Sequence, residues 1–354
     1  MERVIENPRY MFFSYLPPDY SRTGVYLNSP AAESVNLDFV KITSGFIRSF
    51  IQIWKTVKES KNTVDVYVVN SPSHLIAFLL KTMTKKPIIL DAGWPLSDGI
   101  RFSNERMIPM IKTYLIDLIS FHSAKIVILE SDRQIDFVNK KFLVNKSKLK
   151  KVLTGFDEKS YCLSPNIIPE LQSIDTSLPI VMFRGSWNPE SGLNILETAS
   201  HELEKKSLNL IICTNVKERE FQFSKSTIFI SRRLTNQEIR MIYEMSDVVI
   251  GQIANKRRLN RTIPHKAFEA GYFSKPYISG DNQGVRELYS DPDQVEYLQE
   301  TTPEALVNCI SNLIDNETKM KHLGLNIKAR YSEIASQETL GKEFYNLLAE
   351  QIRS

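Results

Sequence analysis

The chain has 354 residues, of which 42% are hydrophobic and 24% charged, and its formal net charge is +4. This composition excludes a disordered chain, and the length suits two domains of ordinary size. The small charge gives little support to nucleic acid as a partner, and we expect none. No apolar run approaches the ~20 residues of a spanning helix, and the first residues do not look like a signal peptide. We expect a cytoplasmic protein with reduced cysteines, in peripheral contact with a membrane at most.

Short apolar runs alternate with helical patterns along the first half of the chain. We predict strands at residues 10–14, 37–42, 64–69, 87–90, 125–129 and 151–153. Between the second and third strands, apolar residues recur at helical spacing from Phe46 to Val57. Alternation of strands and helices is typical of a parallel α/β sheet.

Three prolines between residues 161 and 179 indicate a linker, after which the pattern restarts. We predict strands at 180–183, 208–213, 227–230, 248–250 and 276–279, and helices at 189–205, 236–245 and 264–273. Two α/β units in series predict two Rossmann-like domains, 1–170 and 171–334, that face each other across a cleft. The last helix, 335–354, is a candidate to pack back on the first domain. Parallel sheets bind ligands beyond the carboxyl ends of their strands, so we expect the ligand in the cleft.

Two glycine-containing turns in the second half suit a phosphate ligand. Gly185 follows a predicted strand, and Gly284 lies in a turn before a second helix start. Backbone N–H groups at such places can approach a phosphate closely. Glu269, midway along a helix near these turns, suits hydrogen bonds from ribose hydroxyls, with a solvated surface glutamate as the alternative. Glu287 either orients the second turn or lies exposed at a helix start.

Three segments resemble the donor-binding domain of the retaining family 4 glycosyltransferases, which have the GT-B fold. They are residues 181–193 (VMFRGSWNPESGL), residues 243–250 (YEMSDVVI) and residues 264–278 (PHKAFEAGYFSKPYI), the last followed by DNQGVRE at 281–287. The resemblance covers about residues 180–290 and is only architectural over the first half. It implies transfer of a sugar, with retention, from a nucleotide-sugar donor, and it implies that Glu269 binds the ribose.

The chain departs from the family's pattern at three positions. Arg261 stands where the family has the first of two paired glutamates, near the donor sugar. Ser186 and Ser191 stand where the family has an arginine and a lysine aimed at the diphosphate. Positive groups at that place stabilise the departing nucleoside diphosphate, so their loss needs a replacement.

Nearby basic residues offer that replacement. Residues 256–261 read KRRLNR and follow a predicted strand, and His265 and Lys266 open the next helix. We assign Lys266 and Arg261 to catalysis and the following residues to donor binding: Gly185, Ser186, Arg257, Arg258, His265, Glu269, Gly284 and Glu287. A solvated basic surface is the alternative for the loop.

The first domain supplies candidates for the acceptor side. Asp91 and Trp94 follow a predicted strand, where a ring beside a carboxylate suits a sugar, although Trp94 could equally pack the domain edge. His122, after a long helix, is a catalytic candidate with a structural role as the alternative. Residues 140–151 carry six lysines among apolar residues, which suits an anionic membrane and a lipid-linked acceptor as well as a solvated surface.

These observations predict a metal-independent glycosyltransferase that uses no cofactor besides its nucleotide-sugar co-substrate and acts on a glycan or lipid-linked acceptor. No residue spacing in the chain requires a metal ion. The alternative from another class is a catalytically inactive GT-B partner subunit of a glycosylation complex, favoured by Ser186, Ser191 and Arg261. A sugar-nucleotide epimerase with the same fold is a third reading.

Overall fold

The computed structural model describes residues 8–103, 107–162, 167–172, 174–215 and 221–353, and these form two compact units. The first unit runs to Asp157 and resumes at Gln337, and the second runs from Glu158 to Ser336. The boundary therefore lies before the proline-containing segment and not at residue 170. Residues of that segment contact the second unit, because the carbonyl of Tyr161 accepts a hydrogen bond from Arg240 (3.2 Å) and Glu170 pairs with Arg232 (2.8 Å).

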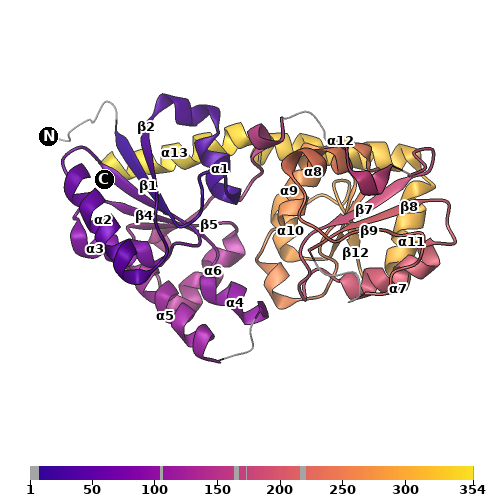
Figure 1. The fold of residues 1–354 in the computed structure, drawn as a ribbon, viewed down its shortest axis with the longest axis horizontal. Helices are drawn as coiled ribbons and strands as arrows, with labels where there is room; N and C mark the ends of the chain where they lie inside the picture. Colours follow the sequence, from indigo (N-terminus) through magenta and orange to yellow (C-terminus); the bar gives the residue numbers. More distant parts are fainter. Residues whose placement is uncertain (1–7, 104–106, 163–166, 173, 216–220, 354) are drawn as a thin grey trace. The chain divides into compact units, whose positions relative to one another are not determined.

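Among the described residues, the first unit has a sheet of six parallel strands in the order β2-β1-β3-β4-β5-β6 (Figure 1). The strands are β1 (Arg9–Ser14), β2 (Asn36–Lys41), β3 (Val66–Asn70), β4 (Ile88–Gly93), β5 (Ile126–Leu129) and β6 (Leu149–Lys151). Every residue of β3, β4 and β5 is buried. Strands covered on both faces read as continuous apolar runs, which is why the sequence predicted them.

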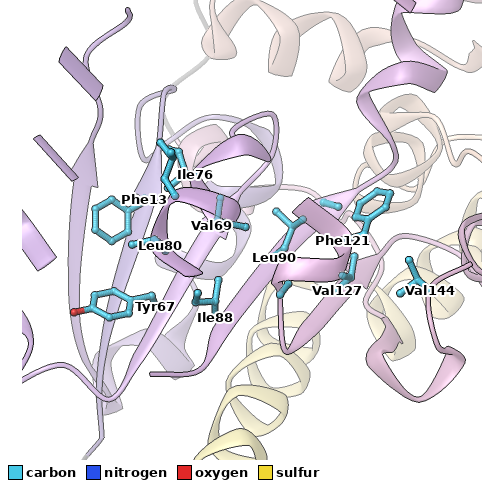
Figure 2. Packing of buried hydrophobic residues seen from close by; sticks show 14 of the residues in the cluster. Phe13, Tyr67, Val69, Ile76, Leu80, Ile88, Leu90, Phe121, Val127 and Val144 are labelled. Atoms are coloured by element: carbon cyan, nitrogen blue, oxygen red, sulfur yellow. The ribbon is translucent and has the colours of Figure 1, made fainter. Parts of the chain in front are cut away.

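One face of this sheet is covered by α2 (Phe46–Ser60), α3 (Leu75–Met83), α5 (Met107–Ser123) and α6 (Asp132–Phe142). Figure 2 shows the apolar cluster beneath them, with Phe13, Val69 and Leu90 of the sheet near Ile76 and Phe121 of the helices. Helices α3, α5 and α6 each connect one strand to its neighbour in the direction from β3 to β6. Helix α2 connects β2 to β3 in the same direction and crosses β1 on the way. Right-handed crossovers therefore place all four on one face.

The last helix of the chain, α13 (Gln337–Arg353), packs on the opposite face of the first unit with α1 (Ser21–Leu27). The rings of Phe344 and Tyr26 stack with centroids 3.8 Å apart, and Phe344 also faces Phe12 of β1. The side-chain amide of Gln337 donates to the carbonyl of Val25 (3.2 Å) and to Asp157 (3.1 Å). These contacts tie the end of the chain to its beginning.

The described part of the second unit has its own sheet of six parallel strands, in the order β12-β11-β10-β7-β8-β9. The strands are β7 (Ile180–Arg184), β8 (Asn209–Cys213), β9 (Ile228–Ile230), β10 (Val248–Ile250), β11 (Tyr277–Gly280) and β12 (Glu296–Leu298), and the sequence pattern missed only β12. The helices around it are α7 (Leu193–Leu203), α8 (Asn236–Met245), α9 (His265–Tyr272), α10 (Gln283–Leu288), α11 (Pro303–Ile314) and α12 (Glu317–Ile334) (Figure 1).

The order of the strands creates a switch point in the second sheet between β7 and β10. The chain runs from β7 outward through β8 and β9 and then returns to β10 on the other side of β7. The segment that leaves β7 and the segment that leaves β10 therefore run over opposite faces of the sheet. Open parallel sheets bind ligands at such a point, beyond the carboxyl ends of the strands.

Candidate functional site

Lys266 lies at the carboxyl ends of β7 and β10. It belongs to the first turn of α9, is only 5% exposed, and places its Nζ 3.2 Å from the side-chain oxygen of Gln252 and 3.5 Å from the carbonyl of Gly251. The ammonium also lies 3.8 Å from the ring centroid of Phe183. A Cβ atom on Gly185 would come within 3.2 Å of Nζ. The switch point therefore holds a buried lysine amine whose nearest partners are two neutral oxygens and a ring.

Burial lowers the pKa of Lys266 well below its ordinary value, and the charge of Arg184 lowers it further, while Glu269 partly opposes the shift. The charged form of a lysine is destabilised when it loses water without gaining a full counter-charge. An anion bound beside Nζ would supply that counter-charge. The site is therefore poised for an anionic ligand.

Glu269 is held by two neighbours on the inner side of α9. Its Oε1 forms an ion pair with the guanidinium of Arg184, and its Oε2 accepts a hydrogen bond from the hydroxyl of Tyr243 at 2.5 Å. Burial raises the pKa of Glu269, but the charge and hydrogen bond of Arg184, with the bond from Tyr243, outweigh it and leave the pKa below its usual value. Glu269 is therefore ionised, and it fixes Arg184 at the end of β7.

The predicted ribose contact of Glu269 has to coexist with these bonds. The residue is 3% exposed, and each carboxylate oxygen is already engaged. A carboxylate has about four lone-pair sites, so it can accept further bonds at the same time. The ribose role stays a prediction, to which the structure adds a second role in positioning Arg184.

Gly284 has a packing role that the sequence reading did not foresee. It lies in the first turn of α10 and is buried, and a Cβ atom there would come 2.4 Å from the carbonyl oxygen of Thr262 and 2.7 Å from that of Leu259. The glycine thus lets α10 approach the loop before α9. This packing by itself accounts for a glycine at position 284. The contact of this turn with a diphosphate stays a prediction.

Replacing Gly284 by alanine is expected to lower the free energy of unfolding by about 1–3 kcal/mol, because the new methyl group meets backbone atoms that cannot move aside. Urea unfolding followed by circular dichroism measures this change. Weaker nucleotide binding with unchanged stability would instead restore the phosphate role of this turn.

The turn before α7 is organised without the basic residues of the family pattern. Ser191 is buried and donates its hydroxyl to the carbonyl of Asn188 (2.7 Å), while Ser186 is exposed. Gly192, with φ of +73°, packs so closely that a Cβ atom would lie 2.4 Å from Cγ1 of Ile253. This close approach joins the start of α7 to the segment that follows β10.

The basic residues between β10 and α9 are not equivalent. Arg258 forms a salt bridge with Glu190 at 2.8 Å, and both side chains are largely buried, so its charge is compensated within the protein. Arg257 is exposed, Arg261 is half-buried, and His265, the first residue of α9, is half-buried. Of the predicted cationic ligands, Lys266 is therefore the one placed directly at the switch point.

Glu287 lies half-buried in α10. Its predicted place in donor binding stays a prediction.

The structure also brings in residues that the sequence reading did not select. Tyr243 and Gln252 come from α8 and from the segment after β10, and the sequence offered no signal for either contact. Arg184 was not among the residues assigned to the site from the sequence. Its position as the last residue of β7 was the available signal, because side chains at the carboxyl end of a parallel strand face the ligand edge.

Asp91 and Trp94 of the first unit lie at the carboxyl end of β4, as expected. Asp91, however, is 1% exposed and its Oδ1 accepts from Nε of Arg22 at 2.6 Å in a buried ion pair. Arg22 also reaches the hydroxyl of Thr154 at 3.3 Å. The carboxylate therefore joins α1 to the sheet, and a sugar would have to displace Arg22 to reach Oδ1. Trp94 is half-buried.

The prediction of a catalytic His122 is wrong about its place in the fold. His122 is in the last turn of α5, which leads into the amino end of β5, and its Nε2 is 3.0 Å from the carbonyl of Phe142. It lines a basic pocket of about 430 Å³ with Lys81, Lys85, Lys86, Lys125 and Lys148. A crossover helix ends at the edge of the sheet where the next strand starts, opposite the ligand edge.

The lysines of residues 140–151 are largely occupied by contacts within the first unit. Lys146 pairs with Asp136 (2.9 Å), Lys151 pairs with Asp132, and Lys148 donates to the carbonyl of His122 (3.2 Å). Lys141 lies over the rings of three neighbouring aromatic residues. This stretch is therefore not a row of free cations.

Within the described residues, no helix is long and apolar enough to cross a membrane. The same residues also contain no group of three or more histidine, cysteine, aspartate or glutamate side chains that could hold a metal ion.

The chain matches no protein-family model and no curated protein by sequence. Its structure resembles sucrose-phosphate synthase from Thermosynechococcus elongatus with a TM-score of 0.75 and 12% identity, over 97% of this chain and 99% of that one. It resembles HepE from Anabaena, solved in complex with UDP-glucose, with a TM-score of 0.73 and 14% identity, over 97% and 99% of the two chains. A protein from Listeria monocytogenes described as a UDP-N-acetylglucosamine 2-epimerase is also similar, with a TM-score of 0.62, 12% identity and coverage of 97% and 95%.

These similarities extend over nearly the whole chain and both of its parallel sheets, at identities too low to carry more than architecture. The prediction of an α/β chain with two Rossmann-like domains is confirmed. The chain has the GT-B fold.

Proposed function

We propose that this protein is a glycosyltransferase that binds a nucleotide sugar through the carboxyl ends of β7 and β10. The observation that carries the proposal is the buried amine of Lys266 at the switch point, which has no full counter-charge to hold a proton on it until an anion binds beside it. A diphosphate would supply the negative charge that the protonated form of Lys266 lacks. In turn, a positive group near a departing nucleoside diphosphate stabilises its developing charge. HepE, which has the same fold, was solved with UDP-glucose and with UDP.

The roles of the residues follow from their positions. Lys266 contacts the diphosphate, and Glu269 holds Arg184 at the end of β7 and compensates its charge. The exposed Arg257 and the half-buried Arg261 are further candidates for the phosphates and the sugar. We further propose that transfer proceeds with retention and without a metal ion, since side-chain cations are available for the leaving group.

The first experiment is calorimetric titration of UDP, GDP and ADP, and of their common sugar conjugates, into the full chain. Binding of one nucleotide by the wild type, and its loss in Lys266→Met, would support the proposal and name the base. Absence of binding to any of these nucleotides would overturn it.

Turnover is tested next with the nucleotide sugar that binds. Proton nuclear magnetic resonance of the mixture shows whether the sugar leaves the nucleotide, and the anomeric signals report its configuration. Unchanged turnover in an excess of EDTA supports metal independence, and loss of turnover contradicts it. Inversion of a stereocentre in the intact donor, with no acceptor added, would identify an epimerase.

A second candidate is an inactive partner subunit that binds a nucleotide sugar or another GT-B chain without turnover. The Arg258–Glu190 pair favours it, because that salt bridge removes one of the cations expected at the leaving group. Ser186 and Ser191 remove two more. Nucleotide binding without sugar release, over a range of acceptors, would place this candidate first.

Nucleotide binding is expected to take up a proton at Lys266. Its pKa is well below the ordinary value in the free protein, and the negative diphosphate raises it in the complex. Between the free and the bound pKa, binding adds a proton, so affinity falls as the pH rises through that window. Above about pH 7.5 the second ionisation of the ligand's phosphate is complete and contributes little.

Titrations at one pH in two buffers of different ionisation enthalpy measure the uptake. We expect uptake in the wild type and none in Lys266→Met if the variant retains weak binding. Equal uptake by both proteins would show that another group titrates.

A further inference from the structure

Helix α2 of the first unit exposes large apolar side chains along one side. Its inward side consists of Ser49, Ile53, Val57 and Ser60, which are buried. Adjacent to that side, at helical spacing, lie the exposed residues Phe46, Ile47, Phe50, Ile51 and Trp54. A helix that met only water on this side would carry polar residues there. The exposed stripe is therefore unexplained by the packing of the first unit.

Helix α5 packs Phe121 into the core but also exposes apolar side chains. Its buried positions include Thr113, Asp117 and Ser120, and its exposed positions include Ile108, Ile111, Leu115 and Ile119. The buried carboxylate has a local reason, because Asp117 accepts hydrogen bonds from the backbone N–H groups of residues 96 and 97 at 2.9 and 2.8 Å. No packing among the described residues covers the exposed apolar side chains of α5 in the same way.

The two stripes belong to one layer of the fold. Helix α3 packs against both α2 and α5 on the same face of the sheet, and it exposes Phe78 between them. We call the exposed apolar residues of α2, α3 and α5 named here the outer apolar face. Scattered apolar side chains are normal on a surface, whereas a set shared by neighbouring helices marks an interaction site.

The charges on these three helices are predominantly positive. The exposed charged residues that the structure describes are Arg48, Lys55, Lys58, Lys81 and Lys112, against a single acid, Glu59. The Nζ atom of Lys58 lies 5.1 Å from the ring centroid of Trp54, so a cation and an indole are presented together. Basic side chains around apolar ones complement a surface that is apolar within and anionic outside.

We propose that the outer apolar face docks the first unit on an anionic lipid bilayer. A second copy of this chain fits less well, because lysine is depleted in protein–protein interfaces and the cations of one copy would face those of the other. The same helices stay folded on the sheet, so binding requires insertion of exposed side chains only. The proposal moves the membrane contact from residues 140–151, whose lysines are largely paired, to α2, α3 and α5.

Vesicle flotation of the full chain tests this inference without any nucleotide, so its result is separate from that of the proposed function. The vesicles are phosphatidylcholine alone and an equimolar mixture with phosphatidylglycerol. We expect binding to the anionic vesicles, weakened by salt. The double variants Ile47→Glu/Ile51→Glu and Ile108→Glu/Ile111→Glu are each expected to lower the partition coefficient at least about tenfold, through lost apolar insertion and added repulsion.

The control is Leu325→Glu, which puts the same charge on an exposed apolar position of α12 (69% exposed) in the second unit and should bind vesicles like the wild type. Circular dichroism shows that each variant is folded. Equal loss in Leu325→Glu, or no binding by the wild type, would overturn the proposal. If light scattering without lipid then showed a dimer that the double variants abolish, the face would be an interface between copies.

Discussion

Replacing Glu269 by alanine is expected to lower the free energy of unfolding of the second unit by about 3–5 kcal/mol. The substitution leaves the guanidinium of Arg184 without its carboxylate in a place where burial is costly, and it takes the acceptor from the hydroxyl of Tyr243. Removing one partner of a buried ion pair costs far more than the pair itself contributes, because the remaining charge is uncompensated. Denaturant unfolding of the wild type and the variant measures the difference.

The chain offers a matched control on α8. Glu244 pairs with Arg240 at 2.6 Å, but both side chains are substantially exposed (42% and 30%). Glu244→Ala should therefore change the stability by about 0.5 kcal/mol or less. Similar small losses for both variants would mean that Arg184 escapes to solvent when Glu269 is removed, and that Glu269 does not position it.

This prediction also affects how the ribose role of Glu269 is tested. Loss of nucleotide binding in Glu269→Ala would be ambiguous, because the variant also releases Arg184. Glu269→Gln keeps an acceptor for Tyr243 and retains much of the shape. If Glu269 contacts the ribose, Glu269→Gln weakens the binding of a nucleotide more than the binding of inorganic pyrophosphate, each relative to the wild type. If Glu269 only positions Arg184, the substitution weakens the binding of both ligands alike.

Replacing Lys266 by methionine is expected to weaken nucleoside diphosphate binding at least about thirtyfold, equivalent to about 2 kcal/mol or more. The variant keeps most of the length of the side chain and removes the amine, which lies over the ring of Phe183. In the complex that ammonium would be a buried partner of the phosphates, and truncating such a partner leaves their charge unpaired. Calorimetric titration measures the loss.

The same substitution should leave stability unchanged or raise it by up to about 4 kcal/mol, as apolar replacements of buried charges often do. The reason is the lowered pKa of Lys266. Between the pKa of Lys266 in the folded protein and its higher pKa in the unfolded chain, only the unfolded chain binds the proton. In that pH range the wild type therefore gains stability as the pH rises. The variant lacks this pH dependence. Weaker binding with a higher melting temperature is the pattern of a residue kept for its ligand and not for the fold.

Lys225→Met is the control, since Lys225 is exposed and precedes β9, at the edge of the sheet opposite the switch point. It should bind nucleotides like the wild type. Unchanged binding in Lys266→Met would contradict the proposal that Lys266 binds the diphosphate. A large loss of stability would contradict the conclusion that burial lowers the pKa of Lys266.

The architecture was predictable from the sequence. Strands buried on both faces have to be continuous apolar runs, and crossover helices have to carry one apolar side, so the alternation along the chain specified two parallel sheets. Helix α8 was predicted to its limits, because Thr235 and Glu238 form a capping box whose residue types are visible in the sequence. The short edge strand β12 was missed, because its three residues, Glu296–Leu298, include a charged one and form no apolar run.

The site was only partly predictable. The sequence placed Gly185 after a predicted strand and Lys266 at the start of a predicted helix, and the fold then brought both to the switch point. It did not reveal that Arg258 is taken by Glu190 or that Glu269 is taken by Arg184, residues 85 positions apart. Which cation meets which carboxylate depends on the packing of separate helices, and no local pattern records it.

The sequence by itself therefore determined the two parallel α/β sheets and the supply of cations near one strand edge, because periodicity and residue type act locally. The tertiary structure decided the rest. It sent His122 to the amino end of β5, made Gly284 a packing residue, and left Lys266 buried without a full counter-charge. These outcomes depend on distances between segments far apart in the chain, and such distances exist only after the units fold.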